Sequence, residues 1–384
     1  MIQNISMEKN NIPTNGDKIK VAHVIRVFSY GGAEVLLREF FAQQEFKENV
    51  ISDVYVLDHI KLGLKDEVAP NIRNFYYYRI TTIAFLFQYI KFLRDITKGK
   101  YDVVHMHLPV AGWMGIAAKL FHPKTKYIYS EHNLVNFYPK YNFYLSGWTY
   151  GFFDCLIYVS HEVGEVVKKY QKGWFFKTKK AVTILNGIDI NKFLCTHRLQ
   201  INPAETLTVG LVARFRPQKR VDRWVEVAAE IHKKNPAIKF LMVGDGPDDE
   251  MLSQKIAEHN LTGIIQLPGK LNDTVSVYKL IDIFLLTSDF EGLPLALLEA
   301  MSCGCIPVVS NVGGIKQLDF GGVGYKFNGF NPAEIADKIV TYAQHPETYF
   351  DQSEKARDFV FKNYSITKQV NEIIDLYRKM IAEK

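Results

Sequence analysis

The chain has 384 residues, of which 47% are hydrophobic and 23% charged, a composition that excludes wholly disordered, collagen-like and coiled-coil proteins. Its length exceeds what one hydrophobic core usually serves, so we expect two domains of roughly 200 residues each. The net charge of +6 fits anionic small molecules or anionic lipid better than a dedicated nucleic-acid reader.

Residues 1–17 are polar and contain no apolar run after a basic start, so we expect a flexible tail rather than a signal peptide. The uncharged runs elsewhere are too short for a membrane-spanning helix. The cysteines at 155, 195, 303 and 305 form no CxxC pair or disulfide framework, which favours a reducing cytoplasm.

Short β-branched runs alternate with longer amphipathic segments along the whole chain. The predicted strands cover residues 21–28, 53–57, 103–107, 127–130, 155–160 and 182–185, and then 207–212, 239–243, 264–267, 283–287, 306–310 and 324–327. Predicted helices include residues 33–43, 221–234, 249–259, 293–303, 333–343 and 366–384. This pattern, which pauses near residue 196 and restarts, predicts an α/β protein with two Rossmann-like domains, at residues 18–195 and 206–362.

Ligands of such sheets bind beyond the carboxyl ends of the strands, so unusual residues there are candidates for a site. Gly31 and Gly32 follow the first strand and open a helix, where the backbone can approach an anion closely. A tight turn explains them equally well. Because neither half has GxGxxG after its first strand, a dehydrogenase is disfavoured.

Three segments of the second half stand at strand ends. Arg214 and Lys219 lie in a basic loop that could hold a diphosphate or simply face solvent. Gly244 begins a Gly-Asp-Gly-Pro turn. Residues 288–300 contain Glu291 in a loop and Glu299 within an otherwise apolar helix, where a carboxylate needs a partner such as ribose hydroxyls or solvent.

Pro294 is expected in the first turn of that helix, which leaves backbone N–H groups near Gly292 and Leu293 free. In the first half, His132 follows a strand and can be an acid, a donor to a sugar hydroxyl or a packed residue. His105 and His107 are expected to be structural, since no carboxylate or cysteine nearby completes a metal site. No Asp-x-Asp occurs.

These motifs in order, with Gly-Gly-Ala-Glu, Glu-His, Asn-Gly-Ile-Asp and Glu-x7-Glu, resemble the family 4 retaining glycosyltransferases over about residues 20–384. The resemblance implies a GT-B fold, with two Rossmann-like domains facing across a cleft. It also implies a donor site mainly in the second domain, a last helix that crosses back onto the first domain, and transfer without a metal or other cofactor.

The resemblance also implies roles for single residues. Arg214 and Lys219 would neutralise the donor diphosphate, Glu299 would hold ribose hydroxyls, and Glu291 and His132 would contact the transferred sugar. The other implied donor-binding residues are Gly31, Gly32, Asn186, Gly244, Lys270, Leu271, Gly292, Leu293, Pro294 and Leu295. Gln317 stands where the family often has Glu, and Lys270 departs from many relatives beside the expected base site.

The expected activity is transfer from a UDP-sugar, favoured over a GDP-sugar, to a glycan in surface polysaccharide biosynthesis. Between residues 119 and 180, ten lysines face four acidic residues and are interleaved with aromatic ones, which suits an anionic membrane surface carrying a lipid-linked acceptor. Core aromatics with solvated lysines are the alternative. A nucleotide-sugar epimerase and an inactive binding protein also remain open, as do the sugar, the acceptor and the oligomeric state.

Overall fold

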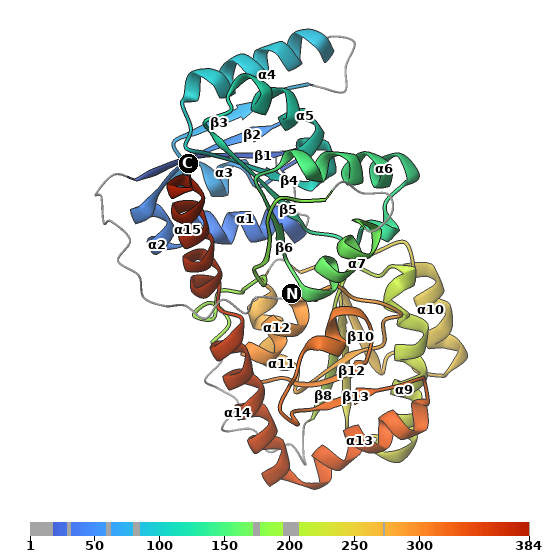
Figure 1. Ribbon diagram of the computed structural model, residues 1–384. Helices are drawn as coiled ribbons and strands as arrows, with labels where there is room; N and C mark the ends of the chain where they lie inside the picture. Colours follow the sequence, from blue (N-terminus) through green and yellow to red (C-terminus); the bar gives the residue numbers. More distant parts are fainter. Residues whose placement is uncertain are drawn as a thin grey trace.

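The computed structural model describes residues 18–28, 32–58, 63–79, 85–171, 177–194, 207–271 and 273–383. Two parallel sheets organise this part of the chain, one in each of two layered units that lie one above the other in Figure 1. The predicted two-domain, Rossmann-like α/β architecture is thus confirmed.

The first sheet has seven strands in the order β3-β2-β1-β4-β5-β6-β7. They are β1 (Ile19–Ile25), β2 (Val50–Val56), β3 (Asn74–Tyr77), β4 (Val103–His107), β5 (Lys126–Glu131), β6 (Cys155–Tyr158) and β7 (Ala181–Thr183). The helices of this unit are α1 (Gly32–Ala42), α2 (Gln44–Asn49), α3 (Lys65–Val68), α4 (Phe85–Gly99), α5 (Leu108–Phe121), α6 (Lys140–Thr149) and α7 (His161–Gln171), with 3-10 turns η1 (Ala69–Asn71), η2 (Val135–Phe137) and η3 (Tyr150–Phe152).

The second sheet has six strands in the order β10-β9-β8-β11-β12-β13. They are β8 (Thr208–Val212), β9 (Lys239–Val243), β10 (Ile265–Gly269), β11 (Ile283–Leu286), β12 (Ile306–Ser310) and β13 (Tyr325–Phe327). Around them lie α9 (Val221–Lys234), α10 (Asp249–Glu258), α11 (Thr274–Leu280), α12 (Leu295–Ser302), α13 (Pro332–Gln344) and α14 (Pro346–Asn363), with η5 (Pro217–Lys219) and η6 (Gly313–Gln317).

In each sheet, successive strands are added on one side of the first strand and then on its other side. This switch lies between β1 and β4 in the first sheet and between β8 and β11 in the second. At such a switch point the loops after the two central strands diverge and leave a crevice at the carboxyl edge. Side chains that follow these four strands are therefore the ones that the topology brings together.

The chain passes between the units twice, at two segments that lie side by side. Ile184 packs in a core cluster of the first unit, whereas Ile188 packs in that of the second, so the first passage falls earlier than the boundary expected at residue 195. Ile188 N–H donates to Tyr364 O at 2.8 Å, where the chain returns. A Cβ on Gly187 would lie 2.5 Å from Ser365 O, so only glycine permits this approach.

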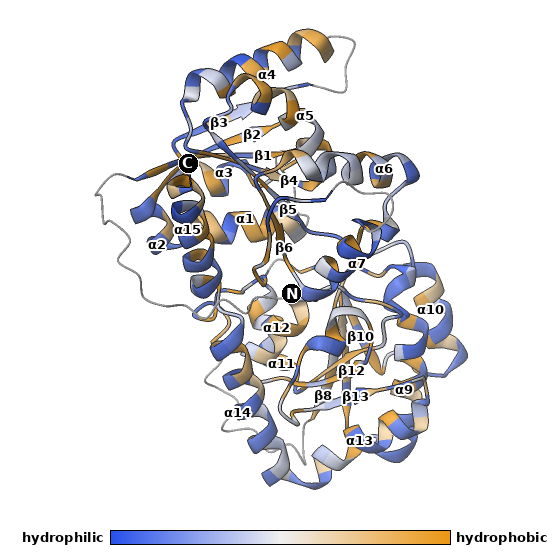
Figure 2. Ribbon diagram, in the orientation of Figure 1, coloured by the Kyte–Doolittle hydropathy of each residue, from blue (hydrophilic) through white to orange (hydrophobic). Residues whose placement is uncertain are grey.

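The last helix, α15 (Ile366–Ala382), packs on the first unit although the helix before it belongs to the second. Figure 1 shows it beside α1 and α2. Its buried stripe includes Val370, Ile373 and Tyr377, which join the cluster on one face of the first sheet. Figure 2 shows hydrophobic residues concentrated on the strands and the inward sides of the helices.

The strand predictions agree with the structure to within a few residues, with one omission. β3 lies in an aromatic run at residues 74–79 that was not predicted as a strand. Tyr76 of β3 stacks on Tyr55 in the first unit, with ring centroids 4.6 Å apart, while Tyr77 is exposed. Within the described residues, no helix is long and apolar enough to cross a membrane.

Candidate functional site

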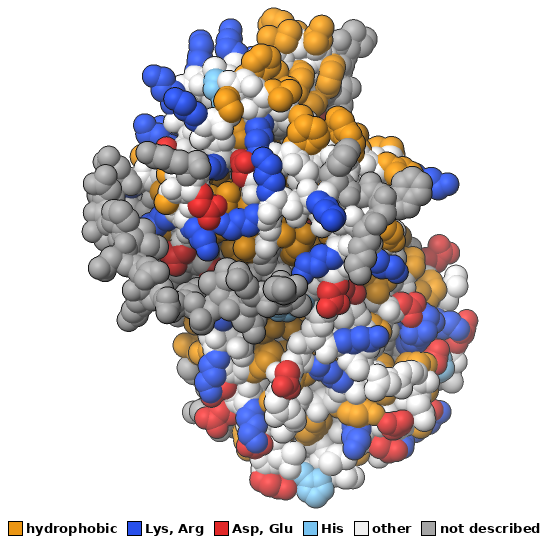
Figure 3. All heavy atoms as spheres, in the orientation of Figure 1, with side chains coloured by type: hydrophobic (Ala, Val, Ile, Leu, Met, Phe, Trp, Pro, Cys, Tyr) orange, Lys and Arg blue, Asp and Glu red, His pale blue; other side chains and the backbone are white. Residues whose placement is uncertain are grey.

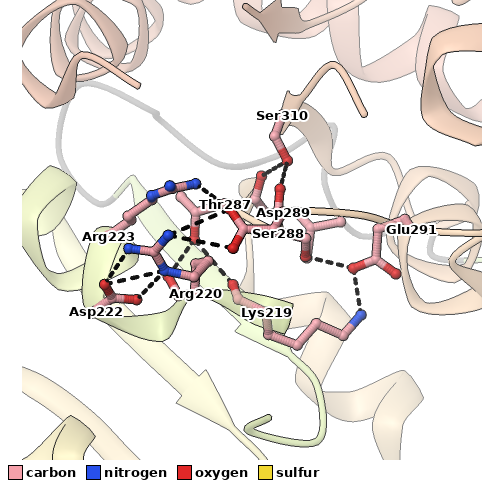
Figure 4. A network of polar contacts seen from close by, with 10 residues as sticks. Lys219, Arg220, Asp222, Arg223, Thr287, Ser288, Asp289, Glu291 and Ser310 are labelled. Carbon is pink, nitrogen blue, oxygen red and sulfur yellow. Dashed lines mark hydrogen bonds and ion pairs between the residues drawn. The ribbon is translucent and has the colours of Figure 1, made fainter. Parts of the chain in front are cut away.

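The loop after β11 holds a buried carboxylate in contact with a lysine from the loop after β8. Lys219 Nζ donates to Glu291 Oε1 at 2.6 Å, and the Ser288 hydroxyl donates to the same oxygen at 2.5 Å (Figure 4). Glu291 is only 5% exposed, so its charge is balanced by Lys219 instead of by water. The second carboxylate oxygen points away from both donors (Figure 4).

A second loop supports the backbone at Glu291. Gly314 N–H donates to Glu291 O at 2.8 Å, and a Cβ on Gly313, whose φ is +51°, would come within 1.9 Å of that oxygen. A Cβ on Gly314 would lie 2.1 Å from Gly292 O. The two glycines of η6 therefore let its backbone press against the loop and hold Glu291 in place.

The basic loop after β8 contains two kinds of cation. Arg220, at the left-handed φ of +48°, is paired with Asp222 at 2.7 Å and with Asp289 at 3.4 Å, and Arg223 also pairs with Asp289, at 2.7 Å (Figure 4). Arg214, by contrast, is exposed and has no ion pair with any described residue. Arg220 thus shapes the loop, while Arg214 and the equally exposed Arg216, neither of which has an ion pair with a described residue, are left for a ligand.

A pocket of about 780 Å³ opens beside these residues. Its lining comes from the loops after β8, β9 and β11 and consists of Arg214, Arg216, Pro217, Gln218, Pro247, Asp289 and Phe290. A pocket of this size, at the carboxyl edge of a sheet and next to unpaired cations, suits an anionic ligand as large as a nucleotide.

The Gly-Asp-Gly-Pro turn after β9 packs tightly on the basic loop. A Cβ on Gly244, whose φ is +147°, would lie 1.8 Å from Ala213 O, and one on Gly246 would lie 2.0 Å from Phe215 O. Phe215 N–H also donates to Asp245 O at 2.8 Å. Only glycine fits at these two positions, because the turn packs directly against the backbone of the loop that carries Arg214. This contact fixes the position of that loop.

Glu299 lies inside α12 and has a protein partner that the sequence did not reveal. Tyr278 of α11 donates its hydroxyl to Glu299 Oε2 at 2.8 Å, and no described residue bonds to Oε1. Burial raises the pKa of Glu299, while Tyr278 and the charge of Lys192 oppose the rise. The carboxylate is therefore held by one donor and keeps one oxygen for a ligand.

The start of α12 differs slightly from the prediction. Pro294 occupies the N-cap position with an extended ψ of 105°, and the helix begins at Leu295 instead of including Pro294 in its first turn. Among the described residues, the N–H groups of Gly292, Leu293 and Leu295 donate no hydrogen bond. Leu295 supplies a free donor of the helix start, and Gly292 and Leu293 supply two more from the loop before the N-cap.

In the first unit, His132 ends a row of hydrogen-bonded histidines. His132 Nε2 lies 3.2 Å from His107 Nδ1, and His107 Nε2 lies 3.2 Å from His23 Nδ1. His105 contacts Ser130 Oγ at 2.7 Å and Tyr377 Oη at 2.6 Å. All of these side chains stand on one face of the sheet because β1 and β4 are adjacent, with His23 opposite His105.

His105 and His107 were expected to be structural, and the structure adds His23 to them. The ring nitrogens of His23, His105 and His107 lie within 4.8 Å of one another, a spacing that could hold a metal ion without any carboxylate or cysteine. Their rings are already bonded to one another, to Ser130 and to Tyr377. Burial and the neighbouring rings lower the pKa of all three well below the usual value, and burial lowers that of His132 to about 4. The row is therefore neutral at pH 7.

The remaining predicted residues lie around this centre. Gly32 begins α1 with open space beside its Cα, and Gly31 lies outside the described residues. Lys270 and Leu271 are exposed just after β10, beside the Gly244 turn, because Gly244 N–H donates to Gly269 O at 3.0 Å. Asn186 lies at the crossing between the units.

At that crossing, Gln369 of α15 donates to Asn186 Oδ1 at 3.2 Å. Gln369 also lines a cavity of about 20 Å³, room for about one water, together with the four histidines.

Phe290, beside Glu291, packs against a core cluster of the first unit. The two switch-point crevices therefore face each other across the same junction.

Glu131, which precedes His132, anchors its own loop instead of facing a ligand. It is fully buried and accepts hydrogen bonds from the hydroxyls of Tyr129 at 3.1 Å and Tyr150 at 2.5 Å, and from Tyr138 as well. Three partners of candidate residues were missed from the sequence, namely Tyr278, Ser288 and His107. Only Ser288 carried a signal, its position three residues before Glu291.

Comparison with known proteins gives a consistent family assignment. A family model described as Glycosyltransferase Family 4 matches residues 30–192, and one described as Glycosyl transferases group 1 matches residues 197–359. The chain is 27% identical over 393 residues to the UDP-Gal:alpha-D-GlcNAc-diphosphoundecaprenol alpha-1,3-galactosyltransferase of Escherichia coli, with 96% of this chain and 98% of that protein covered. It is 25% identical to the N-acetyl-alpha-D-glucosaminyl L-malate synthase of Bacillus anthracis, with 83% and 87% covered.

Solved structures share the fold. HepE of Anabaena in complex with UDP superposes with a TM-score of 0.80 at 17% identity, covering 94% of this chain and 100% of that one. The same protein in complex with UDP-glucose gives a TM-score of 0.78 at 19% identity, with the same coverage of the two chains.

Proposed function

The chain belongs to the family 4 glycosyltransferases with the GT-B fold, and on that premise we propose that it is a retaining enzyme that transfers a sugar from a UDP-sugar to a lipid-linked glycan during surface polysaccharide biosynthesis. The main support for a donor site is the contact of Lys219 with buried Glu291. The exposed Arg214 and the pocket of about 780 Å³ that it lines lie beside this contact.

The breaking bond explains why these cations suit the reaction. As the bond between the anomeric carbon and the diphosphate breaks, negative charge develops on the leaving group. Arg214 and Lys219, both at the carboxyl edge of the second sheet, would stabilise that charge in a cleft from which much water is excluded. Because two side-chain cations supply this stabilisation, we propose that the transfer needs no divalent metal.

The carboxylates would orient the donor. Glu299 has Oε1 free and is held by Tyr278, which suits acceptance of hydrogen bonds from vicinal ribose hydroxyls. The second oxygen of Glu291, which points away from Lys219 and Ser288 (Figure 4), would accept from hydroxyls of the transferred sugar. We propose that the acceptor hydroxyl attacks the anomeric carbon from the leaving-group face as the bond to the diphosphate breaks, while the departing phosphate takes the hydroxyl proton.

His132 is proposed as a neutral hydrogen-bonding partner of the sugar from the first unit. Its lowered pKa, about 4, keeps the ring uncharged at pH 7, so it does not compete with Arg214 and Lys219 for the diphosphate. His107, bonded to its other side, fixes which ring nitrogen faces the junction. Its contribution is orientation, not charge.

Two relatives support the acceptor class. The name of the Escherichia coli relative includes a diphosphoundecaprenol acceptor, and a further relative, 25% identical, is an O-antigen biosynthesis glycosyltransferase, WclY, from the same species. We propose the same class of acceptor here, and leave the sugar unassigned because single hydroxyl epimers differ by only a few contacts.

A thermal-shift screen against UDP, GDP, ADP and CMP in EDTA tests the donor site first. A ligand at ~100-fold its dissociation constant stabilises the folded state by about 2.7 kcal/mol. We expect stabilisation by UDP, its loss in Lys219→Ala, and its retention in Lys233→Ala, whose lysine is exposed on α9 far along the chain from the loop. Stabilisation only after magnesium is added would contradict metal-independent binding.

Donor turnover separates the transferase from its two alternatives. Slow release of UDP from UDP-glucose or UDP-galactose with no acceptor present would support transfer chemistry. Interconversion of the two UDP-sugars would instead indicate an epimerase. UDP binding with neither release nor interconversion, across a panel of UDP-sugars, would favour a binding protein.

A further inference from the structure

One surface of the first unit exposes large hydrophobic side chains that no part of the described chain covers. Leu86 and Phe87 of α4 are 66% and 68% exposed, and Leu120 and Phe121 at the end of α5 are 72% and 69% exposed. Figure 3 shows hydrophobic side chains gathered over α4 and α5. Single exposed leucines are common, but a group of this kind marks a contact surface.

The pattern of α4 shows that this exposure is not incidental. Its inner face buries Phe92 and Ile96, four residues apart, as an amphipathic helix should. Its first two turns are apolar on the outer face as well, at Phe85, Leu86, Phe87 and Ile90. The inner face of this helix packs on the core of the first unit. Its apolar outer face has no such partner among the described residues, so it needs a second apolar environment.

The outer face becomes cationic along the same helix. Arg94 and Lys98 are exposed in the second half of α4, and Figure 3 shows Lys and Arg side chains beside the hydrophobic group. Within α4 (residues 85–99), Lys91, Arg94 and Lys98 are exposed, and Asp95 is the only acidic residue. This surface is therefore apolar and positive together.

Two neighbouring helices extend it. Thr97 of α4 bonds to His122 after α5 at 2.7 Å, and Tyr89 bonds to Met114 O at 3.0 Å, so α4 and α5 run in the same direction side by side. α6 follows on the other side of α5 and exposes Tyr141, Tyr144 and Trp148. Tyrosine and tryptophan are the residues that favour the interface between lipid headgroups and acyl chains.

We propose that the outer face of α4, α5 and α6 docks on an anionic lipid bilayer. The positive charge of this face favours a bilayer over a second copy of the chain. Two copies of the same positive face would repel each other, whereas anionic headgroups attract it. Leu86, Phe87, Ile90, Leu120 and Phe121 enter the headgroup boundary, and Arg94 and Lys98 lie against the headgroups.

This docking would place the junction close to the bilayer. α5 begins at Leu108, directly after His107, and the apolar start of α4 lies beside the first half of α5, since Tyr89 bonds to Met114 O. An acceptor held in the bilayer could reach the junction along this helix. In that respect the proposal rests on the lipid-linked acceptor of the proposed function.

Vesicle co-sedimentation tests the surface without donor or acceptor, so it can fail separately from the proposed function. We expect the full chain to bind vesicles of phosphatidylcholine with 30% phosphatidylglycerol at low salt, and much more weakly without phosphatidylglycerol. Leu86→Ser with Phe87→Ser should reduce binding at least about tenfold. Arg94→Glu with Lys98→Glu should reduce it by roughly 25-fold or more, about fivefold per cation.

Two controls match these changes. Leu280→Ser removes a leucine that is 63% exposed on α11 of the second unit, and Lys233→Glu reverses an exposed lysine of α9. Both should bind vesicles as the unchanged protein does, and all variants should keep their melting temperature and their response to UDP. No binding at low salt, or equal losses in the controls, would overturn the proposal. So would a dimer that becomes a monomer in Leu86→Ser with Phe87→Ser while vesicles stay unbound.

Discussion

Acidification should weaken the first domain selectively, through its buried histidines. Burial lowers the pKa of His23, His105 and His107 in the folded protein, while in the unfolded chain each titrates near ~6.5. Below that value the unfolded state binds more protons than the folded state. The stability that depends on neutral histidines is therefore complete above pH 6.5 and is lost as the pH falls toward the folded pKa.

The size of the effect follows from the same linkage. For one histidine that stays neutral when folded, lowering the pH from 7.5 to 5.5 costs about 1.4 kcal/mol of unfolding free energy. Three such residues cost about 4 kcal/mol, and His132, whose pKa burial lowers to about 4, adds about 1.3 kcal/mol. The sum is a large part of the ~5–15 kcal/mol that stabilises a typical domain. His107→Gln should remove about 1.4 kcal/mol of this pH dependence, whereas His345→Asn, at a histidine with a 54% exposed side chain, should leave it unchanged.

Pulse-labelling hydrogen exchange along a urea series measures this in each domain separately. Peptides from β1 and β4 should show the loss between pH 7.5 and 5.5, while peptides from β8 and β11 provide the reference within the same molecule. If the first domain lost less than about 1 kcal/mol relative to the second, the histidines would accept protons without unfolding. The inference that the histidines are neutral at pH 7, and with it the proposed orientation of His132, would then be wrong.

The remaining predictions concern the second domain. Lys219→Ala should lower kcat/KM by roughly 10²–10³, because it removes charge stabilisation of the leaving diphosphate, and steady-state UDP release measures it. Glu299→Gln should raise the KM for donor by roughly tenfold to 100-fold with kcat nearly unchanged; a large fall in kcat alone would contradict a binding role. Gly244→Ala should destabilise by more than ~3 kcal/mol in urea unfolding, since its Cβ would lie 1.8 Å from Ala213 O. Gly263→Ala, with φ of +80° and open space, should cost only ~1 kcal/mol.

Much of the fold follows from the sequence because each strand carries its own signal. Strands buried on both faces of a parallel sheet read as short, mostly apolar runs, and Val103–His107 and Ile306–Ser310 were predicted to the residue. β3 was missed because Tyr76 and Tyr77 have different environments on one short edge strand. A run of tyrosines does not tell which of them is exposed.

The site was predictable in part, for a different reason. Arg214, Lys219, Glu291 and Glu299 stand just after strands or at a helix start, where topology concentrates ligand contacts. Their partners are set by packing between segments far apart in the chain. Lys219 and Glu291 are 72 residues apart, and nothing local indicates that they meet.

The histidine row shows the same limit. His105 and His107 are two residues apart, so a strand places both on one face, and this much was predicted. His23 joins them only because β4 pairs with β1 directly, with His23 opposite His105. The order of strands within a sheet decides that contact, and no pattern within either strand specifies it.

The return of α15 to the first domain has a consequence for synthesis. Ile366, Val370, Ile373 and Tyr377 complete a hydrophobic face whose other residues leave the ribosome long before them. At ~5–20 residues per second, that face stays uncovered for on the order of ten seconds or more while the second domain is made. The nascent chain thus presents a predictable target for a chaperone. A message truncated after Tyr364 would keep the core residues of the second domain but leave the first domain without its last helix.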